Sequence, residues 1–468
     1  MSSRVERMKD FIEGYVPEVM REARVPGMSI AVLKEGEVVY AEGFGARDVE
    51  KGLPATPDTL YGIGSCTKSF VATAVMQLVE RGMLRLDDPV AKHIPFELGL
   101  PGKPITVHHL LTHSSGLPNL ATSTVAIRRG IGRDMGVPWG GVNDFYRHVN
   151  GAGEELADEP GRRFFYNNSG YRMLGHLIQN VSGRPFHRYI EEEIIKPLGM
   201  ERTTLVNSKA MEDPDRLTPY KKTPEGLEPS KFPYPDPEEV GEFSFISAAG
   251  GVVSSVVELT RYLEMNMNGG TLGHAEILSP ESVARMHFIH IERDPGYYGR
   301  YGYGYGWGVT ESFMDHKMVS HSGSISVSTA HLSFIPDLKI GVAMAANSMG
   351  PPYTYIAEGV YAALMGEDPM EVVPGIQVSK RMRALKGSYE TYRGIQRLEV
   401  VESGGLLHLK SSTDLGETLK PLIPEDDMMS STRFYTLTNG VRQPVEFVKG
   451  PDGGVDLFIE RYRYHRKT

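Results

Sequence analysis

The sequence predicts an α+β fold: an α/β/α sandwich with an antiparallel sheet and a helical insertion, followed by a small all-β domain. Strand-like runs lie near both ends of the segment before Pro374, and mostly helices and loops lie between them. Beyond Pro374 the chain changes to short β-type runs separated by turns. A sheet built from both ends of a domain explains the first pattern. We therefore expect two domains, residues 1–375 and residues 384–468.

The first domain begins with a helix and a hairpin. Residues 4–24 have the spacing of an amphipathic helix, and residues 28–45 form two strand-like runs that meet at Glu35-Gly36. The strands that complete the sheet come late. They are predicted at residues 318–323, 329–335 and 340–347, with a turn at Pro336-Asp337 and a helix over 353–365. The Tyr-Gly alternation at 301–308 is expected to be a loop that enters a strand.

The second domain is predicted from short apolar runs and dense turn signals. The runs lie at residues 397–401, 406–410 and 455–462, and Ser403-Gly-Gly and Pro451-Asp-Gly-Gly separate strands. About 80 residues of this kind form a barrel or a sandwich, and the strand spacing does not distinguish the two.

The composition argues against several classes of partner. A net charge of −9, with no dense basic block before residues 461–467, argues against nucleic acid. The polar first residues and the lack of an apolar run of about 18 residues predict a soluble, cytoplasmic protein that does not bind membranes. The single cysteine, Cys66, excludes an internal disulfide and fits a reducing compartment.

No cofactor or metal is expected. His108, His109 and His113 lie close together in the sequence, but no neighbouring carboxylate or cysteine pattern completes a zinc site.

Ser65 and Lys68 are the first candidates for catalysis. They lie three residues apart at the start of a run of helix formers, so their side chains share one helical face. A lysine with a pKa lowered by desolvation can take the proton of a serine hydroxyl and make it a nucleophile. The Gly-x-Ser-x-Gly motif of α/β-hydrolases is absent around Ser65, which disfavours that fold.

Two further segments carry groups that an activated serine needs. Tyr166 and Asn168 lie on a loop that leads into a predicted helix. A phenol near the serine can relay its proton, and an amide can orient the lysine or hold a substrate carbonyl. His321 and Gly323 lie on a predicted strand, where the glycine lets a substrate backbone approach closely. A third segment, residues 110–117, is expected to shape a turn beneath the site.

Taken in order, these motifs resemble the serine β-lactamase and penicillin-binding protein superfamily. The similar branch contains class C β-lactamases, D-Ala-D-Ala carboxypeptidases, D-aminopeptidases and esterases, and the resemblance covers roughly residues 15–365. It implies acyl transfer, in which Ser65 attacks a carbonyl and water releases the acyl-enzyme. It also implies that the Ser65 and Ser324 amides form the oxyanion hole, and that Lys68 and Tyr166 act together as the base.

The sequence departs from the β-lactamase pattern at His321. Penicillin-recognising members usually carry Lys-Thr-Gly there, whereas His-x-Gly resembles the peptidase and esterase relatives. A histidine with an ordinary pKa is mostly neutral at pH 7, so it lacks the lysine's charge for a substrate carboxylate. Hydrogen bonding to Tyr166 or to the leaving group is then its expected role.

We therefore expect a serine hydrolase that acts on short peptides, including peptides with D-residues. An esterase or lactonase, a weak β-lactamase, and a binding or scaffold protein on a degenerate hydrolase fold are the alternatives. The C-terminal domain resembles the small, sometimes lipocalin-like, domains of peptidase relatives, which suggests a homo-oligomer assembled through it.

Overall fold

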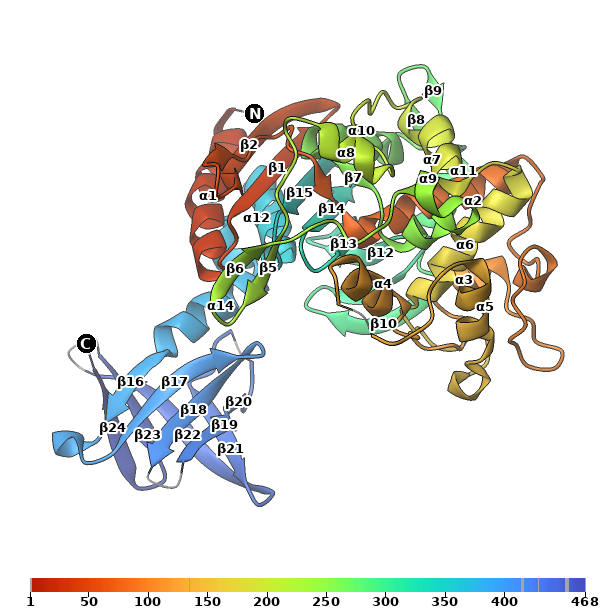
Figure 1. Ribbon diagram of the computed structural model, residues 1–468. Coiled ribbons are helices and arrows are strands. Elements are labelled where there is room, and N and C mark those ends of the chain that lie inside the picture. The colour runs from red at the N-terminus through yellow and green to blue at the C-terminus, as the bar shows by residue number, and fades with distance from the viewer. Residues whose placement is uncertain (1, 134, 414–415, 428, 451–453, 468) are drawn as a thin grey trace. The chain divides into compact units, whose positions relative to one another are not determined.

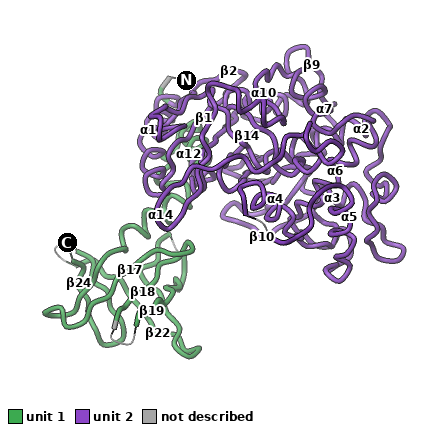
Figure 2. Tube along the Cα trace, in the orientation of Figure 1, with its two compact units in different colours: residues 1, 3, 358–468 green, residues 2, 4–357 purple. Residues whose placement is uncertain are grey.

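The computed structural model describes residues 2–133, 135–413, 416–427, 429–450 and 454–467. The chain divides into two compact units, residues 4–357 and residues 358–468 (Figure 2). The division falls within helix α12 (Tyr353–Met365), and helix α14 (Pro374–Leu385) occupies the interval between the two predicted domains. The predicted domain boundaries, residue 375 for the end of the first domain and residue 384 for the start of the second, stay a prediction.

The larger unit is built on a nine-stranded antiparallel sheet with strand order β10-β11-β12-β13-β14-β15-β1-β2-β3 (Figure 1). Strands from the two ends of the unit are neighbours in it, because β1 pairs with β15. The sheet consists of β1 (Gly27–Lys34), β2 (Glu37–Asp48), β3 (Leu53–Pro54), β10 (Ile291–Gly296), β11 (Gly299–Tyr303), β12 (Gly308–Phe313), β13 (His316–Ser324), β14 (Thr329–Ile335) and β15 (Ile340–Ala346).

The central strands are buried because both faces of the sheet are covered. Every residue of β14 and β15 is buried. Helix α10 (Val256–Met267) packs on β15, β1 and β14, and helix α1 (Ser2–Glu22) lies on the other side of the sheet (Figure 1). The predicted hairpin turn is confirmed: Glu35 and Gly36 both have positive φ, as a two-residue turn between twisted strands requires.

One sequence prediction in this unit is wrong. Residues 301–308 do not form a loop that enters a strand, because Tyr301 to Tyr303 already belong to β11 and Gly308 begins β12, to which β11 pairs. The turn between them closes through a hydrogen bond from the Gly304 amide to the Trp307 carbonyl. The Tyr-Gly alternation therefore belongs to a β-hairpin.

The helices fill the space between the early and late strands. Helix α2 lies at their centre, and all its residues from Thr67 to Leu78 are buried. Helix α6 packs against α2. The α-helices of this region are α2 (Thr67–Glu80), α3 (Val107–Leu111), α4 (Thr122–Gly130), α5 (Val142–Asn150), α6 (Asn168–Ser182), α7 (Phe186–Ile190), α8 (Asn207–Glu212), α9 (Pro237–Val240), α10 and α11 (Pro280–Met286). No described helix combines the length and the apolar character needed to cross a membrane.

The β part of the smaller unit is a closed barrel. Its strands follow the order β19-β18-β17-β16-β24-β23-β22-β21-β20, and only Leu422 separates β19 from β20 along the chain, so the sheet closes on itself. The strands are β16 (Gly387–Glu390), β17 (Arg397–Ser403), β18 (Leu406–Thr413), β19 (Gly416–Pro421), β20 (Ile423–Pro424), β21 (Arg433–Thr438), β22 (Val441–Lys449), β23 (Val455–Ile459) and β24 (Tyr462–Arg466).

Side chains fill the barrel interior. Leu407, Leu422, Phe434 and Leu457 are buried together there with other apolar residues of the strands, and Leu385 of α14 belongs to the same cluster. The predicted turn at Pro451-Asp-Gly-Gly lies mostly outside the described residues.

Candidate active site

Ser65 lies at the entrance to the central helix. Residues Gly64–Cys66 form a 3-10 turn, η1, that leads directly into α2. Gly64 has φ +54, and a Cβ at this position would lie 2.5 Å from the Ser324 amide nitrogen. Glycine is therefore required here both for the backbone conformation and for the close approach of strand β13.

Lys68 is fully buried, and its Nζ has three polar neighbours. The distances are 3.0 Å to Ser65 Oγ, 2.8 Å to Asn168 Oδ1 and 2.8 Å to the Ala249 carbonyl oxygen. Burial holds the pKa of Lys68 well below its usual range, and the nearby charge of Arg172 lowers it further. The lysine is therefore neutral over a range of pH in which an exposed lysine is charged.

The arrangement of acceptors orients this neutral amine. The Asn168 side-chain oxygen and the Ala249 carbonyl can only accept hydrogen bonds, so they take the two N–H groups of the amine. The nitrogen lone pair is then left for the Ser65 hydroxyl. This is the geometry of a general base beside a nucleophile.

Tyr166 lies beside both Ser65 and Lys68. Its ring centroid is 4.9 Å from Lys68 Nζ, and its phenol is near enough to the Ser65 hydroxyl for the serine to lower the pKa of Tyr166. Burial raises the pKa of Tyr166, and the contact with Ser65 acts against this rise. The phenol is protonated at neutral pH, so it can pass a proton between Ser65 and a leaving group.

Asn168 is placed by the start of helix α6. It is the first residue of that helix, and the preceding Asn167 caps the helix by accepting hydrogen bonds from the Ser169 and Gly170 amides. His113 supports the same loop, because its Nδ1 accepts a hydrogen bond from the Asn167 amide at 3.0 Å. His113 has φ +59 within residues 110–117, so that segment does shape a turn beneath the site.

His321 is buried, and both of its ring nitrogens have partners other than Tyr166. Nδ1 donates to the Ser322 carbonyl at 2.7 Å, and Nε2 accepts from the Tyr303 hydroxyl at 3.0 Å. Burial, helped by Lys68, lowers the pKa of His321 to about 3, so the ring is neutral. The expected hydrogen bond to Tyr166 is absent from these contacts, and the ring centroids are 6.3 Å apart.

Gly323 brings the backbone of β13 against η1. A Cβ at Gly323 would lie 1.9 Å from the Ile63 carbonyl oxygen and 2.7 Å from the Ser65 amide nitrogen. Only glycine permits this approach, which sets the amides of Ser65 and Ser324 on neighbouring backbone segments. Two backbone amides so placed are the donors that a tetrahedral oxyanion needs.

Several functional positions have no local sequence signature. The Ala249 carbonyl, Tyr303 and Arg172 all act on the residues above, but each is far from Ser65 in the chain. The only local hint for Ala249 is its position in the small-residue run Ser247 to Gly251. Arg293, on β10, is exposed, and its charge acts on the pKa values of His113, Tyr166 and His321.

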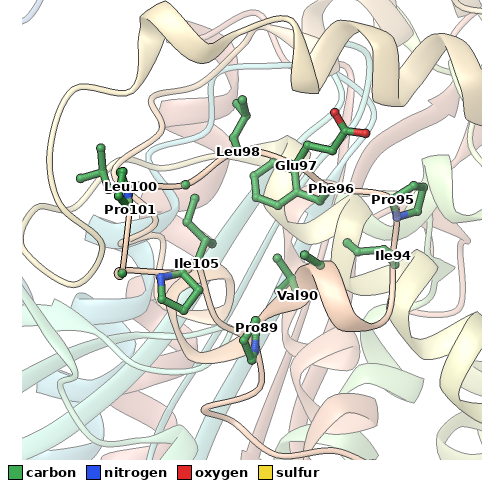
Figure 3. A pocket seen from close by; sticks show the side chains of 14 residues that line it. Pro89, Val90, Ile94, Pro95, Phe96, Glu97, Leu98, Leu100, Pro101 and Ile105 are labelled. Atoms are coloured by element: carbon green, nitrogen blue, oxygen red, sulfur yellow. The ribbon is translucent and has the colours of Figure 1, made fainter.

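No metal centre competes with this site among the residues that the structure describes. No group of three or more described His, Cys, Asp or Glu side chains could hold a metal ion. A cavity of about 670 Å³ is formed by residues 89–105 (Figure 3). Its lining is almost entirely apolar, and Glu97 is its only charged residue. It therefore lacks a nucleophile paired with a base.

The site pairs a serine with a neighbouring buried lysine, and the fold is an antiparallel sheet with helices on both faces. Together these features define the serine acyl-transfer class of site. The comparisons identify the family within that class. Residues 12–364 match the Beta-lactamase family model, and the chain belongs to that family. It is a family of serine hydrolases on the predicted α+β fold, so the predicted resemblance is confirmed. Residues 369–465 match the model of the Pab87 octamerisation domain.

Solved structures and curated proteins agree with this assignment. The octameric penicillin-binding protein homologue from Pyrococcus abyssi is 39% identical, with a TM-score of 0.90, and the match covers 98% of this chain and 99% of that one. The D-amino acid amidase from Ochrobactrum anthropi has a TM-score of 0.61 at 22% identity, over 76% of this chain and 98% of that one, and shows the fold alone. Protein flp of Staphylococcus aureus is 28% identical over 72% of this chain, and the match spans 62% of its own length.

Proposed function

We propose that this protein is a serine hydrolase that works through an acyl-enzyme. The observation that supports this proposal is the buried Lys68 amine, whose two acceptor-only partners leave its lone pair for the Ser65 hydroxyl. Ser65 Oγ attacks the substrate carbonyl carbon, and its proton passes to the Lys68–Tyr166 pair. The amides of Ser65 and Ser324 hold the oxyanion. The bond to the leaving group then breaks, the leaving group takes up that proton, and water repeats the sequence to release the acid.

Short peptides, including peptides with D-residues, are the proposed substrates. Arg293 supports a substrate that carries a free carboxylate. Its guanidinium lies over the rings of Phe164 and Tyr301, at 4.6 Å and 4.9 Å, and donates to the Tyr301 hydroxyl. An exposed guanidinium held on aromatic rings beside the catalytic groups is suited to bind a carboxylate.

β-Lactam hydrolysis is expected to be weak. A neutral imidazole occupies the position at which penicillin-recognising relatives usually have a charged lysine. His321 has no free ring nitrogen for a substrate carboxylate, because the Ser322 carbonyl and Tyr303 take both.

The test combines covalent labelling with a substrate panel. A fluorophosphonate should label Ser65, identified by peptide mass spectrometry, and Ser65→Ala should abolish labelling and turnover while the melting temperature changes by only a few degrees. Nitrocefin, p-nitrophenyl acetate and matched L- and D-peptides then define the acyl specificity. A wild-type protein that neither labels nor turns over any of them would favour the alternative of a binding or scaffold protein.

We also propose a homo-oligomer that assembles through residues 369–465. The match to an octamerisation domain and the octameric state of the Pyrococcus abyssi homologue support this. The cytoplasmic location stays a prediction.

A further inference from the structure

Arg172 is fully buried, and no acidic side chain among the described residues pairs with it. Its Nε donates to the Ile246 carbonyl at 3.0 Å, but neither Nη1 nor Nη2 makes a hydrogen bond of good geometry with the described residues. Its guanidinium lies 5.8 Å from the Trp139 ring centroid. Burial lowers the pKa of Arg172, and the nearby Tyr234 phenol acts against this lowering. A buried charge with so little compensation is costly, which suggests that it has a function.

Arg172 is connected to both acceptors that hold the Lys68 amine. On helix α6 it lies four residues after Asn168, so the two side chains leave the same face of the helix. Its bond to the Ile246 carbonyl ties that helix to the 3-10 segment η5 (Gly241–Ala249), which ends at Ala249. One side chain therefore connects the two backbone segments that supply the acceptors for Lys68.

Arg172 is also the charged group that acts on Lys68. Burial is the main cause of the lowered pKa of Lys68, and the charge of Arg172 lowers it further. The other titratable groups around the amine are neutral at pH 7, because burial raises the pKa values of the thiol and the phenols and lowers those of the imidazoles. They are Cys66, Tyr166, Tyr171, His113 and His321. Arg293 acts on Tyr166, His113 and His321, but not on Lys68.

We propose that Arg172 is a positioning residue for the general base: it holds Asn168 and Ala249 in place around Lys68 and supplies a fixed positive charge that opposes protonation of the amine. This inference rests on the proposed function. It assigns Arg172 no contact with substrate. Its two roles are separable, since a lysine at this position keeps the charge without the Nε bond, and a methionine removes both.

The experiment measures the rate of fluorophosphonate labelling of Ser65, and kcat/KM for p-nitrophenyl acetate, between pH 5 and pH 9. The acidic limb of each profile reports protonation of the base. In Arg172→Met the limb should move to higher pH by at least about half a unit, so the rate on the limb falls about threefold beyond any loss at the plateau. In Arg172→Lys the limb should stay near its wild-type position while the plateau falls.

Arg261→Met is the matched control. Arg261 also donates through Nε to a backbone carbonyl, that of Leu198, but it has no effect on Lys68. The acidic limb of the pH profile of Arg261→Met should stay at its wild-type position. Arg172→Gln serves as a second neutral variant.

An Arg172→Met protein that is folded by circular dichroism and keeps the wild-type limb would overturn the proposal. If both neutral variants were unfolded, a structural role for Arg172 would replace it. The proposed function fails in a different way, because the wild-type protein would then show neither labelling nor turnover.

Discussion

At the residue scale, the proposed chemistry depends on the protonation of a single amine, that of Lys68. Lys68 is buried among groups that carry no negative charge at neutral pH, and its nearest hydrogen-bond partners are oxygens. Burial of an amine in such surroundings favours the neutral form. The same burial that makes Lys68 a base therefore has a measurable cost to the stability of the folded chain.

Lys68→Met should lower acylation by orders of magnitude, because an unactivated serine stays protonated at neutral pH. It should also change how stability depends on pH. Between the lowered pKa of the folded state and about 10.4, the unfolded wild-type chain binds a proton that the folded chain does not, so the free energy of unfolding rises with pH. The variant lacks this linkage.

The measurement is the melting temperature of both proteins at pH 7, 8, 9 and 10. The melting temperature of Lys68→Met minus that of the wild type should decrease steadily across the series. A difference that does not vary with pH would mean that Lys68 is charged in the folded protein.

Arg293→Gln should separate binding of a substrate carboxylate from the chemistry. KM for peptides with a free C-terminal carboxylate is expected to rise roughly three- to tenfold, since an exposed charge-assisted contact is worth only about 1 kcal/mol. Turnover of p-nitrophenyl acetate should be nearly unchanged. Steady-state kinetics on the peptide and on its C-terminal amide provide the measurement.

Arg300→Gln is the control for Arg293. Arg300 is also exposed, but Glu292 and Glu311 already pair with it. Equal effects of the two variants, or an equal effect on the amidated peptide, would contradict a specific carboxylate contact.

At the element scale, the site is the place where three elements meet: the η1–α2 junction, the start of α6 and the end of β13. Helix α2 lies at the centre of the fold, and every residue from Thr67 to Leu78 is buried. Strand β13 reaches η1 only because Gly323 has no side chain. The position of the proposed oxyanion hole is therefore set by backbone packing.

Gly323→Ala tests this packing. The new Cβ would collide with the Ile63 carbonyl and crowd the Ser65 amide, so β13 must move away from η1. Loss of one oxyanion donor typically lowers kcat about 10²- to 10³-fold, and we expect a loss in this range for p-nitrophenyl acetate. Gly14→Ala, in helix α1, is the control, since a Cβ there meets nothing within 4 Å. Near-normal kcat in Gly323→Ala would remove the Ser65–Ser324 pair as the oxyanion hole.

At the scale of the whole molecule, all the groups assigned above to the candidate site lie in residues 4–357, whereas the barrel belongs to residues 358–468. Met382 and Leu385 of α14 belong to the barrel core and Val378 of the same helix packs against it, so a cut inside α14 would divide a helix that belongs with the barrel. A cut after Asp368, beyond the end of α12, avoids this.

A chain truncated after Asp368 should remain folded, label at Ser65 and hydrolyse p-nitrophenyl acetate, while its mass in solution falls to that of a smaller assembly. Light scattering, labelling and kcat/KM for peptides of increasing length are measured on the full and the truncated chains. If the barrel restricts access to the site, longer peptides become better substrates after truncation. An insoluble truncated chain would count against independent folding, and an unchanged mass would count against assembly through residues 369–465.

The amino-acid sequence alone determined the elements and the local pair at the heart of the site. The hairpin at Glu35-Gly36, the late strands and the helix over 353–365 follow from short-range periodicity and turn residues. Ser65 and Lys68 are three residues apart, so a single helical turn brings them together whatever surrounds it. Tyr166, Asn168 and the His321–Gly323 motif were found as groups that an activated serine needs. The family resemblance added the oxyanion role of the Ser65 and Ser324 amides.

Only the tertiary structure decided which groups from distant parts of the chain contact one another. The Ala249 carbonyl meets Lys68 across 181 residues, and as a backbone group it leaves no mark on the sequence. Tyr303, which is expected from the sequence to lie in a loop, is placed in strand β11 and becomes the partner of His321. The choice between barrel and sandwich rested on whether β19 and β20 close the sheet. Periodicity encodes which face of an element is buried, but not which group, far along the chain, will be packed against that face.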